Sequence, residues 1–78
     1  MEKNNKSESK LNNMSQRLKM LRKENGLSQL QVAEKLYVTR SAYANYEQGT
    51  RQPGPDIIIK LSELYNVSTD YLLGVSKK

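Results

Sequence analysis

The chain has 78 residues, a length that suits one small domain with a single modest hydrophobic core. It contains no cysteine and no histidine, which argues against disulfide bonds, thiol chemistry, most zinc sites and the usual general base of an enzyme. Its charged fraction of 27% and its formal net charge of +5 are ordinary for a folded basic domain. We therefore expect no enzymatic activity, no cofactor and no metal site.

Membrane insertion and secretion are not expected. No apolar run approaches the roughly 18 to 20 residues that a bilayer span requires, and the first ten residues lack the apolar segment of a secretory signal. The sequence thus predicts a cytoplasmic protein with no membrane segment.

Positive charge is concentrated in the middle of the chain. Residues 14–52 carry seven lysine or arginine residues against three glutamates, whereas residues 53–75 carry one lysine against three acidic residues. Such a basic region favours an anionic partner such as nucleic acid. Solvated surface charge without a partner explains it equally well.

The first predicted helix begins at Met14 and follows a polar arm. Residues 1–13 contain mainly Asn, Ser, Lys and Glu, so we expect a flexible arm. From Met14 onward, Leu18 and Leu21 share one stripe at helical spacing. Gly26 ends this helix, because glycine tolerates the left-handed conformation at a helix C-terminus.

Two short helices joined by a tight turn come next. Ser28 and Gln31 match a capping box at the start of a helix over residues 29–36. Thr39 is a good N-cap for a helix over residues 40–48, which a glycine closes. A turn of about three residues joins them, the arrangement of a helix-turn-helix.

The helix over residues 40–48 has two different faces. Tyr43 and Tyr46 lie on an apolar face, which we assign to the core rather than to base stacking. The opposite arc holds mostly short side chains: Arg40, Ser41, Ala44, Asn45 and Gln48. A helix with so slender a face can enter a DNA major groove roughly 12 Å wide.

Two further helices complete an all-α domain over residues 14–75, before a basic end at residues 76–78. One helix starts at Pro55, behind an N-cap glycine, and runs to about Tyr65. Ile59 points away from its core stripe. Ser68 caps a last short helix over residues 69–73.

This order of caps, glycines and apolar positions resembles the Xre/Cro-type helix-turn-helix family, the lambda-repressor-like DNA-binding domains. The resemblance spans about Met14 to Gly74 and rests on Gly26-Leu-Ser-Gln29, Val32-Ala33, Val38-Thr39, Tyr46-Glu47, Gly49, Pro53, Val67-Ser68 and Asp70-Tyr-Leu-Leu-Gly74. It implies a five-helix domain that binds double-stranded DNA in the major groove at a palindromic operator. The implied function is transcriptional regulation, with repression as the expected mode.

The resemblance and the helical geometry point to the same reading face. The residues expected to contact bases are Arg40, Ser41, Ala44 and Asn45, since arginine can pair with guanine and asparagine with adenine. The residues expected at phosphates are Gln29, Thr39, Thr50, Arg51 and Gln52. For Gln29 the alternative is a polar first-turn residue, and for the loop residues it is surface solubility.

Two structural features follow from the resemblance. Arg22 and Glu47 resemble a pair in the family that links the first helix to the end of the reading helix. We expect this ion pair to orient the two helices more than to stabilise the fold. Tyr37 stands where the family usually has glycine. A left-handed backbone would cost tyrosine about 1–2 kcal/mol, so the turn either bears that cost or adopts another geometry, with the ring on the surface or near DNA.

We expect a homodimer, because one small domain makes too few contacts for tight selectivity on DNA. The candidate interface consists of Ile59, Tyr71, Leu73 and Val75. Lys3, Lys6 and Lys10 of the arm either follow the DNA backbone or belong to an inert tail. No small-molecule ligand is evident. The main alternative function is a protein-interaction module of the same fold, such as an antitoxin-like protein or a regulatory subunit, with DNA binding secondary.

Overall fold

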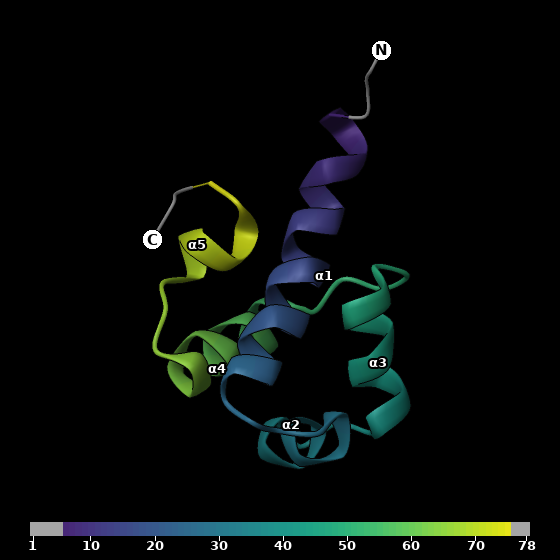
Figure 1. Cartoon of the computed structure of the whole chain (residues 1–78), viewed down its shortest axis with the longest axis vertical. Coiled ribbons are helices and arrows are strands. Elements are labelled where there is room, and N and C mark those ends of the chain that lie inside the picture. Colours follow the sequence, from purple (N-terminus) through teal and green to yellow (C-terminus); the bar gives the residue numbers. More distant parts are fainter. Residues whose placement is uncertain (1–5, 76–78) are drawn as a thin grey trace.

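The computed structural model describes the backbone of residues 6–75 and the side chains of residues 14–75. This part of the chain folds into five helices: α1 (Lys6–Glu24), α2 (Gln29–Leu36), α3 (Arg40–Gln48), α4 (Pro55–Tyr65) and α5 (Thr69–Leu73). Residues 6–75 contain no strand (Figure 1). The predicted all-α, five-helix fold is confirmed.

The start of α1 differs from the sequence prediction. The helix begins at Lys6 rather than at Met14, so residues 6–13 are helical. This segment contains no glycine or proline, and a helix propagates readily from a turn that is already formed. In Figure 1 the first turns of α1 extend beyond the other helices.

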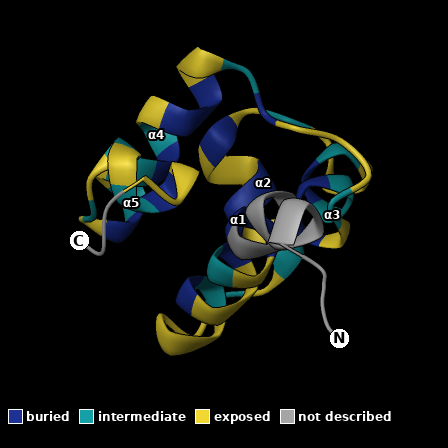
Figure 2. Ribbon diagram, turned by 90° about the horizontal axis from the view of Figure 1, so that it is seen from above, coloured by how far each residue is buried: buried dark blue, intermediate teal, exposed yellow. Residues whose placement is uncertain are grey.

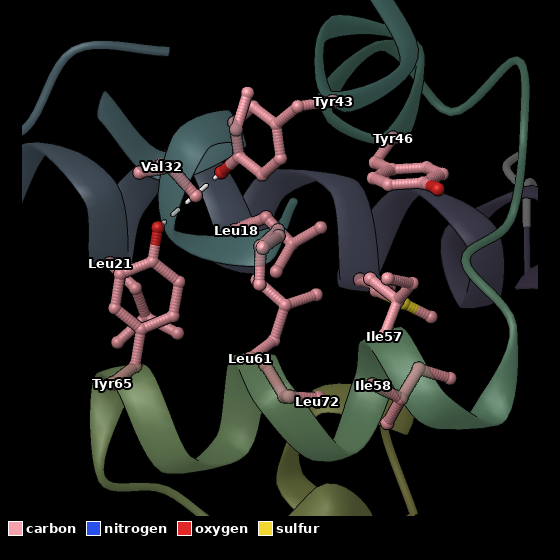
Figure 3. Packing of buried hydrophobic residues seen from close by; sticks show 13 residues of the cluster. Leu18, Leu21, Val32, Tyr43, Tyr46, Ile57, Ile58, Leu61, Tyr65 and Leu72 are labelled. Atoms are coloured by element: carbon pink, nitrogen blue, oxygen red, sulfur yellow. Dashed lines mark hydrogen bonds between the residues drawn. The ribbon is translucent and has the colours of Figure 1, made fainter. Parts of the chain in front are cut away.

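The core lies where all five helices meet. α1 packs against α3 and α5, α2 packs against α3 and α4, and α4 packs against α5. Each helix contributes at least one side chain that is fully buried, among them Leu18, Val32, Tyr43, Leu61 and Leu72. Buried positions turn toward the middle of the molecule and exposed positions face outward (Figure 2). These five side chains pack against one another in the core and lie at the predicted helical spacing (Figure 3).

Local capping bonds set the starts of α2 and α3. The Gln31 N–H donates to Ser28 Oγ at 3.0 Å, and the Ser28 N–H donates to Gln31 Oε1 at 2.8 Å. This is the predicted capping box. At the start of α3, the Ala42 N–H donates to Thr39 Oγ1 at 3.0 Å. Both helices therefore begin at the predicted residues.

The turn between α2 and α3 places Tyr37 in the left-handed conformation, with φ 61° and ψ 41°. The alternative backbone geometry considered from the sequence is thus wrong, whereas the surface position of the ring is confirmed at 86% exposure. The Val38 N–H donates to the Ala33 carbonyl at 3.0 Å, and Val38 packs against the core. Lys60 Nζ lies 5.0 Å from the centroid of the Tyr37 ring. These contacts hold the strained turn.

Replacing Tyr37 by glycine is expected to give a more stable protein than replacing it by alanine. The expected difference in unfolding free energy is about 0.5–1 kcal/mol, because glycine avoids a left-handed penalty of about 1–2 kcal/mol but loses roughly 0.5–1 kcal/mol in entropy. Both variants lack the ring, so their difference isolates the backbone contribution. Urea unfolding measures it. Equal stabilities would show that the turn is unstrained in solution.

Candidate nucleic-acid interface

The outward side of α3 carries the residues predicted to contact bases. Arg40 and Ser41 are exposed, and Ala44 and Asn45 are partly exposed. The opposite side of the helix holds Tyr43 and Tyr46, which are buried with their rings edge to face and 6.2 Å between centroids. The predicted core role of both tyrosines is confirmed. The aromatic side anchors α3 and leaves its slender side open to solvent.

The residues predicted to contact phosphates lie at the two helix starts and in the loop after α3. Thr39 Oγ1 accepts the capping bond, which leaves its own proton free to donate. Thr50 directs both its hydroxyl, at 3.3 Å, and its N–H, at 3.1 Å, to the carbonyl of Asn45. Thr50 must therefore rotate before its hydroxyl can donate to a phosphate. Arg51 and Gln52 are exposed in the loop.

A buried carboxylate beneath this surface joins three helices. The Glu47 side chain is 1% exposed and lies 2.6 Å from Arg22 Nε, measured from its Oε2. Arg22 Nη2 donates to Glu47 Oε1 at 3.1 Å, and Arg22 Nη1 donates to the Leu27 carbonyl at 2.9 Å. Gln29 Nε2 also donates to Glu47 Oε1 at 3.1 Å. α1, α2 and α3 are thus tied together at Glu47.

The donors around Glu47 keep this carboxylate charged. Burial by itself raises the pKa of Glu47, but the hydrogen bonds from Arg22, Tyr43 and Gln29 outweigh it, and the pKa is lowered from its usual value. The hydrogen bond to Glu47 raises the pKa of Arg22. Both groups are therefore ionised at neutral pH, and each compensates the desolvation of the other.

Two tyrosine hydroxyls join this cluster, which the sequence pattern did not predict. The Tyr43 hydroxyl interacts with Glu47 and helps to lower the pKa of that carboxylate, and its oxygen lies 3.4 Å from that of Tyr65 (Figure 3). Burial raises the pKa of both tyrosines, so both hydroxyls stay protonated at neutral pH. The sequence offered one signal for this contact, because a tyrosine assigned to the core usually needs a polar partner for its hydroxyl.

Gln29 connects the buried cluster to the outward side of α3. Its Nε2 bonds Glu47, and its Oε1 lies 3.4 Å from Nη1 of the exposed Arg40. The structure therefore brings one predicted phosphate contact beside one predicted base contact. The loop residues after α3 form a separate part of the predicted interface.

The residues predicted for a dimer interface differ in their surroundings. Ile59 is 51% exposed and Leu73 is 40% exposed. Both line an open groove of about 420 Å³ between α4, α5 and the loop before α4. Val75 is 71% exposed. Tyr71 is partly buried, with the Arg17 guanidinium 4.7 Å from its ring centroid, so it is less available than the other three.

Other predicted features are only partly covered by the structure. Lys3 and residues 76–78 lie outside the described residues, as do the side chains of Lys6 and Lys10. Within the described range, no helix combines the length and apolar character needed to cross a bilayer. The acidic side chains described here form no group of three that would hold a metal ion.

Comparison with known proteins identifies relatives of this chain. A helix-turn-helix family model matches residues 18–72. The HTH-type transcriptional regulator ImmR of Bacillus subtilis (strain 168) is 50% identical over 83% of this chain and 54% of its own length. The HTH-type transcriptional regulator AnsR of the same organism is 37% identical over 80% of this chain and 53% of its own length. The chain therefore spans about half the length of these relatives.

A solved structure has a similar fold. The P22 c2 repressor protein, in complex with a synthetic operator, superposes with a TM-score of 0.76 and 25% sequence identity. The match covers 81% of this chain and 96% of that chain.

Proposed function

Because the chain belongs to the helix-turn-helix family, we propose that it is a transcriptional regulator that binds double-stranded DNA by inserting α3 into the major groove. The observation that carries this proposal is the division of α3 into a buried aromatic side and an open side of mostly small residues. Similarity to the P22 c2 repressor bound to operator DNA supports a repressor role. Such a protein acts in the cytoplasm, on the DNA of the nucleoid.

The reading residues have separate roles in this proposal. Arg40 donates two hydrogen bonds to guanine and Asn45 pairs with adenine, while Ala44 contacts a thymine methyl and Ser41 a neighbouring base edge. Phosphate contacts come from the start of α2, the start of α3 and the following loop: Gln29, Thr39, Thr50, Arg51 and Gln52. The phosphate contacts set the register, and the base contacts select the sequence.

Specific recognition by so small a domain calls for two copies on a palindromic operator. We assign the dimer contact to the groove between α4 and α5, which Ile59 and Leu73 line, together with the exposed Val75 and the partly buried Tyr71 that follow or belong to α5. Apolar side chains this exposed are suited to cover one another across a two-fold axis. The half-sites then lie about 34 Å apart, one turn of DNA.

Replacing Arg40 or Arg51 by alanine is expected to give two different losses of DNA binding. Arg40→Ala removes a base contact, so it should cost about 1–3 kcal/mol at one guanine and relax the preference there. Arg51→Ala removes a phosphate contact, so it should weaken all duplexes alike and reduce the salt slope by about 1. In vitro selection of bound duplexes, followed by titrations at several salt concentrations, measures both.

The same experiment tests the alternative function. An unchanged sequence preference in Arg40→Ala would overturn the assignment of the reading residue. Duplex affinity that is weak and insensitive to salt in the unaltered protein would instead favour a protein-interaction module, since DNA binding releases counterions.

A further inference from the structure

A series of interacting polar side chains runs from the core to the outward side of α3. Tyr65 in α4 meets Tyr43 in α3, and Tyr43 meets Glu47 one turn further along the same helix. Glu47 then meets Gln29 in α2, and Gln29 meets Arg40 at the start of α3. We call these five residues the relay. It connects a buried tyrosine of α4 to the residue proposed to read guanine.

In each contact of the relay, the chemistry of the two groups decides which one is the donor and which one is the acceptor. An ionised carboxylate only accepts hydrogen bonds, so Tyr43 is the donor in its interaction with Glu47, which lowers the pKa of the carboxylate. The Tyr43 oxygen is then the acceptor for Tyr65. The Gln29 amide likewise turns Nε2 toward Glu47, which leaves Oε1 to accept from the guanidinium of Arg40.

We propose that Tyr65 is a positioning residue for base reading, whose hydroxyl orients Arg40 through Tyr43, Glu47 and Gln29. This inference rests on the proposed function of DNA binding. Hydrogen bonds in a series polarise one another, so the proton from Tyr65 strengthens the hold of Tyr43 on Glu47. A carboxylate held in one place keeps the oxygen of Gln29 facing Arg40. The guanidinium is then already oriented before DNA arrives, which reduces the entropy lost on binding.

The relay does not compete with the phosphate contact proposed for Gln29. The Nε2 group has two protons, and the bond to Glu47 uses one of them. The other proton can donate to a phosphate while Oε1 holds Arg40. Gln29 therefore serves both roles in one conformation.

The test compares two tyrosine-to-phenylalanine variants. Tyr65→Phe removes the inner hydroxyl of the relay and keeps the ring in the core. Tyr46→Phe is the matched control, because it removes a hydroxyl from a buried tyrosine of α3 that points away from the Tyr43–Tyr65 pair (Figure 3). The probes are the duplex selected with the unaltered protein and an unrelated duplex of equal length.

Tyr65→Phe is expected to lower the ratio of specific to non-specific affinity by about three- to tenfold, the range for one neutral hydrogen bond. The salt slope and the helical circular dichroism should not change. Tyr46→Phe should leave the ratio unchanged. A loss of packing alone does not alter this ratio while the protein stays folded, so an equal effect in the two variants, or none in Tyr65→Phe, would overturn the proposal.

A double variant tests whether the effect passes through Gln29. In a Gln29→Ala protein the relay is already broken, so adding Tyr65→Phe is expected to change the affinity ratio less than twofold. A full three- to tenfold loss in that background would show that Tyr65 acts by another route.

A measurement without DNA separates failure of this inference from failure of the proposed function. In nuclear magnetic resonance spectra, the side-chain amide signals of Gln29 should shift in Tyr65→Phe and stay in place in Tyr46→Phe. Unmoved Gln29 signals in Tyr65→Phe would contradict the relay whatever the protein binds. Shifted signals in a protein that binds no duplex would contradict the proposed function and leave the relay as a structural feature.

Discussion

Replacing Arg22 by methionine is expected to lower the unfolding free energy by about 3–5 kcal/mol, because it leaves the carboxylate of Glu47 buried without its charged partner. A small domain has a total stability of roughly 5–15 kcal/mol, so this single change brings the protein close to unfolding. Urea or thermal unfolding at neutral pH measures the loss. A change below about 1 kcal/mol would show that the pair behaves like an exposed salt bridge.

The pH dependence of this loss follows from the pKa of Glu47. In the unaltered protein this pKa is lowered, so its stabilising contribution is complete above the usual carboxylate pKa of about 4.3 and is lost as the pH falls through the folded-state value. In Arg22→Met, burial is no longer outweighed and the pKa should rise. The cost of the buried charge in the variant then disappears as the pH falls below this raised pKa. The unfolding free energies of the two proteins should therefore converge as the pH falls through about 4.3 and below.

The control for Arg22→Met is the double variant with Glu47→Met. Two apolar side chains in place of a buried ion pair often match or exceed its stability, so most of the loss should be recovered. DNA selectivity should not return, because no carboxylate then holds Gln29 and Tyr43. Recovery of both properties would contradict the orienting role of Glu47.

Replacing Leu72 by alanine is the second large expected effect. Leu72 is fully buried and is the buried residue of α5, so its truncation should cost about 2–5 kcal/mol and weaken the attachment of α5 to α1 and α4. Unfolding in urea measures the stability, and sedimentation measures the oligomeric state. Because the groove is lined from both α4 and α5, loss of α5 should also abolish the proposed dimer.

The neighbouring leucine is a matched control. Leu73 is 40% exposed in the groove, so Leu73→Ala should change the unfolding free energy by less than about 1 kcal/mol. It should nevertheless shift the protein toward monomer. A dimer as tight as that of the unaltered protein in Leu73→Ala would contradict the proposed interface.

Helices α2 to α5 could be predicted from the sequence because their end signals are local. Ser28, Thr39 and Ser68 each accept a hydrogen bond from the first turn of their helix, so the residue type and the structure agree. The start of α1 could not be predicted in this way. Polar composition suggested an arm, whereas helix propagation from the packed end carries it back to Lys6.

The reading face and the relay were predictable to different degrees. Helical periodicity placed Arg40 and Asn45 opposite the tyrosines, because the position on a helix depends only on spacing. It assigned Tyr43 to the core but could not show that its hydroxyl meets Tyr65, since that contact depends on how α4 packs. The conformation of Tyr37 was similarly beyond the sequence, because the tertiary contacts of Val38 outweigh its local preference.

The division of α3 into two sides has a consequence for how such proteins diverge. None of the side chains on its open side is buried, so Ser41, Ala44 and Asn45 can be exchanged at little cost to folding. A lineage can therefore acquire a new target site while its scaffold stays intact. Arg40 is the exception, because a substitute has to suit its contact with Gln29 as well as the base pair that we propose it reads.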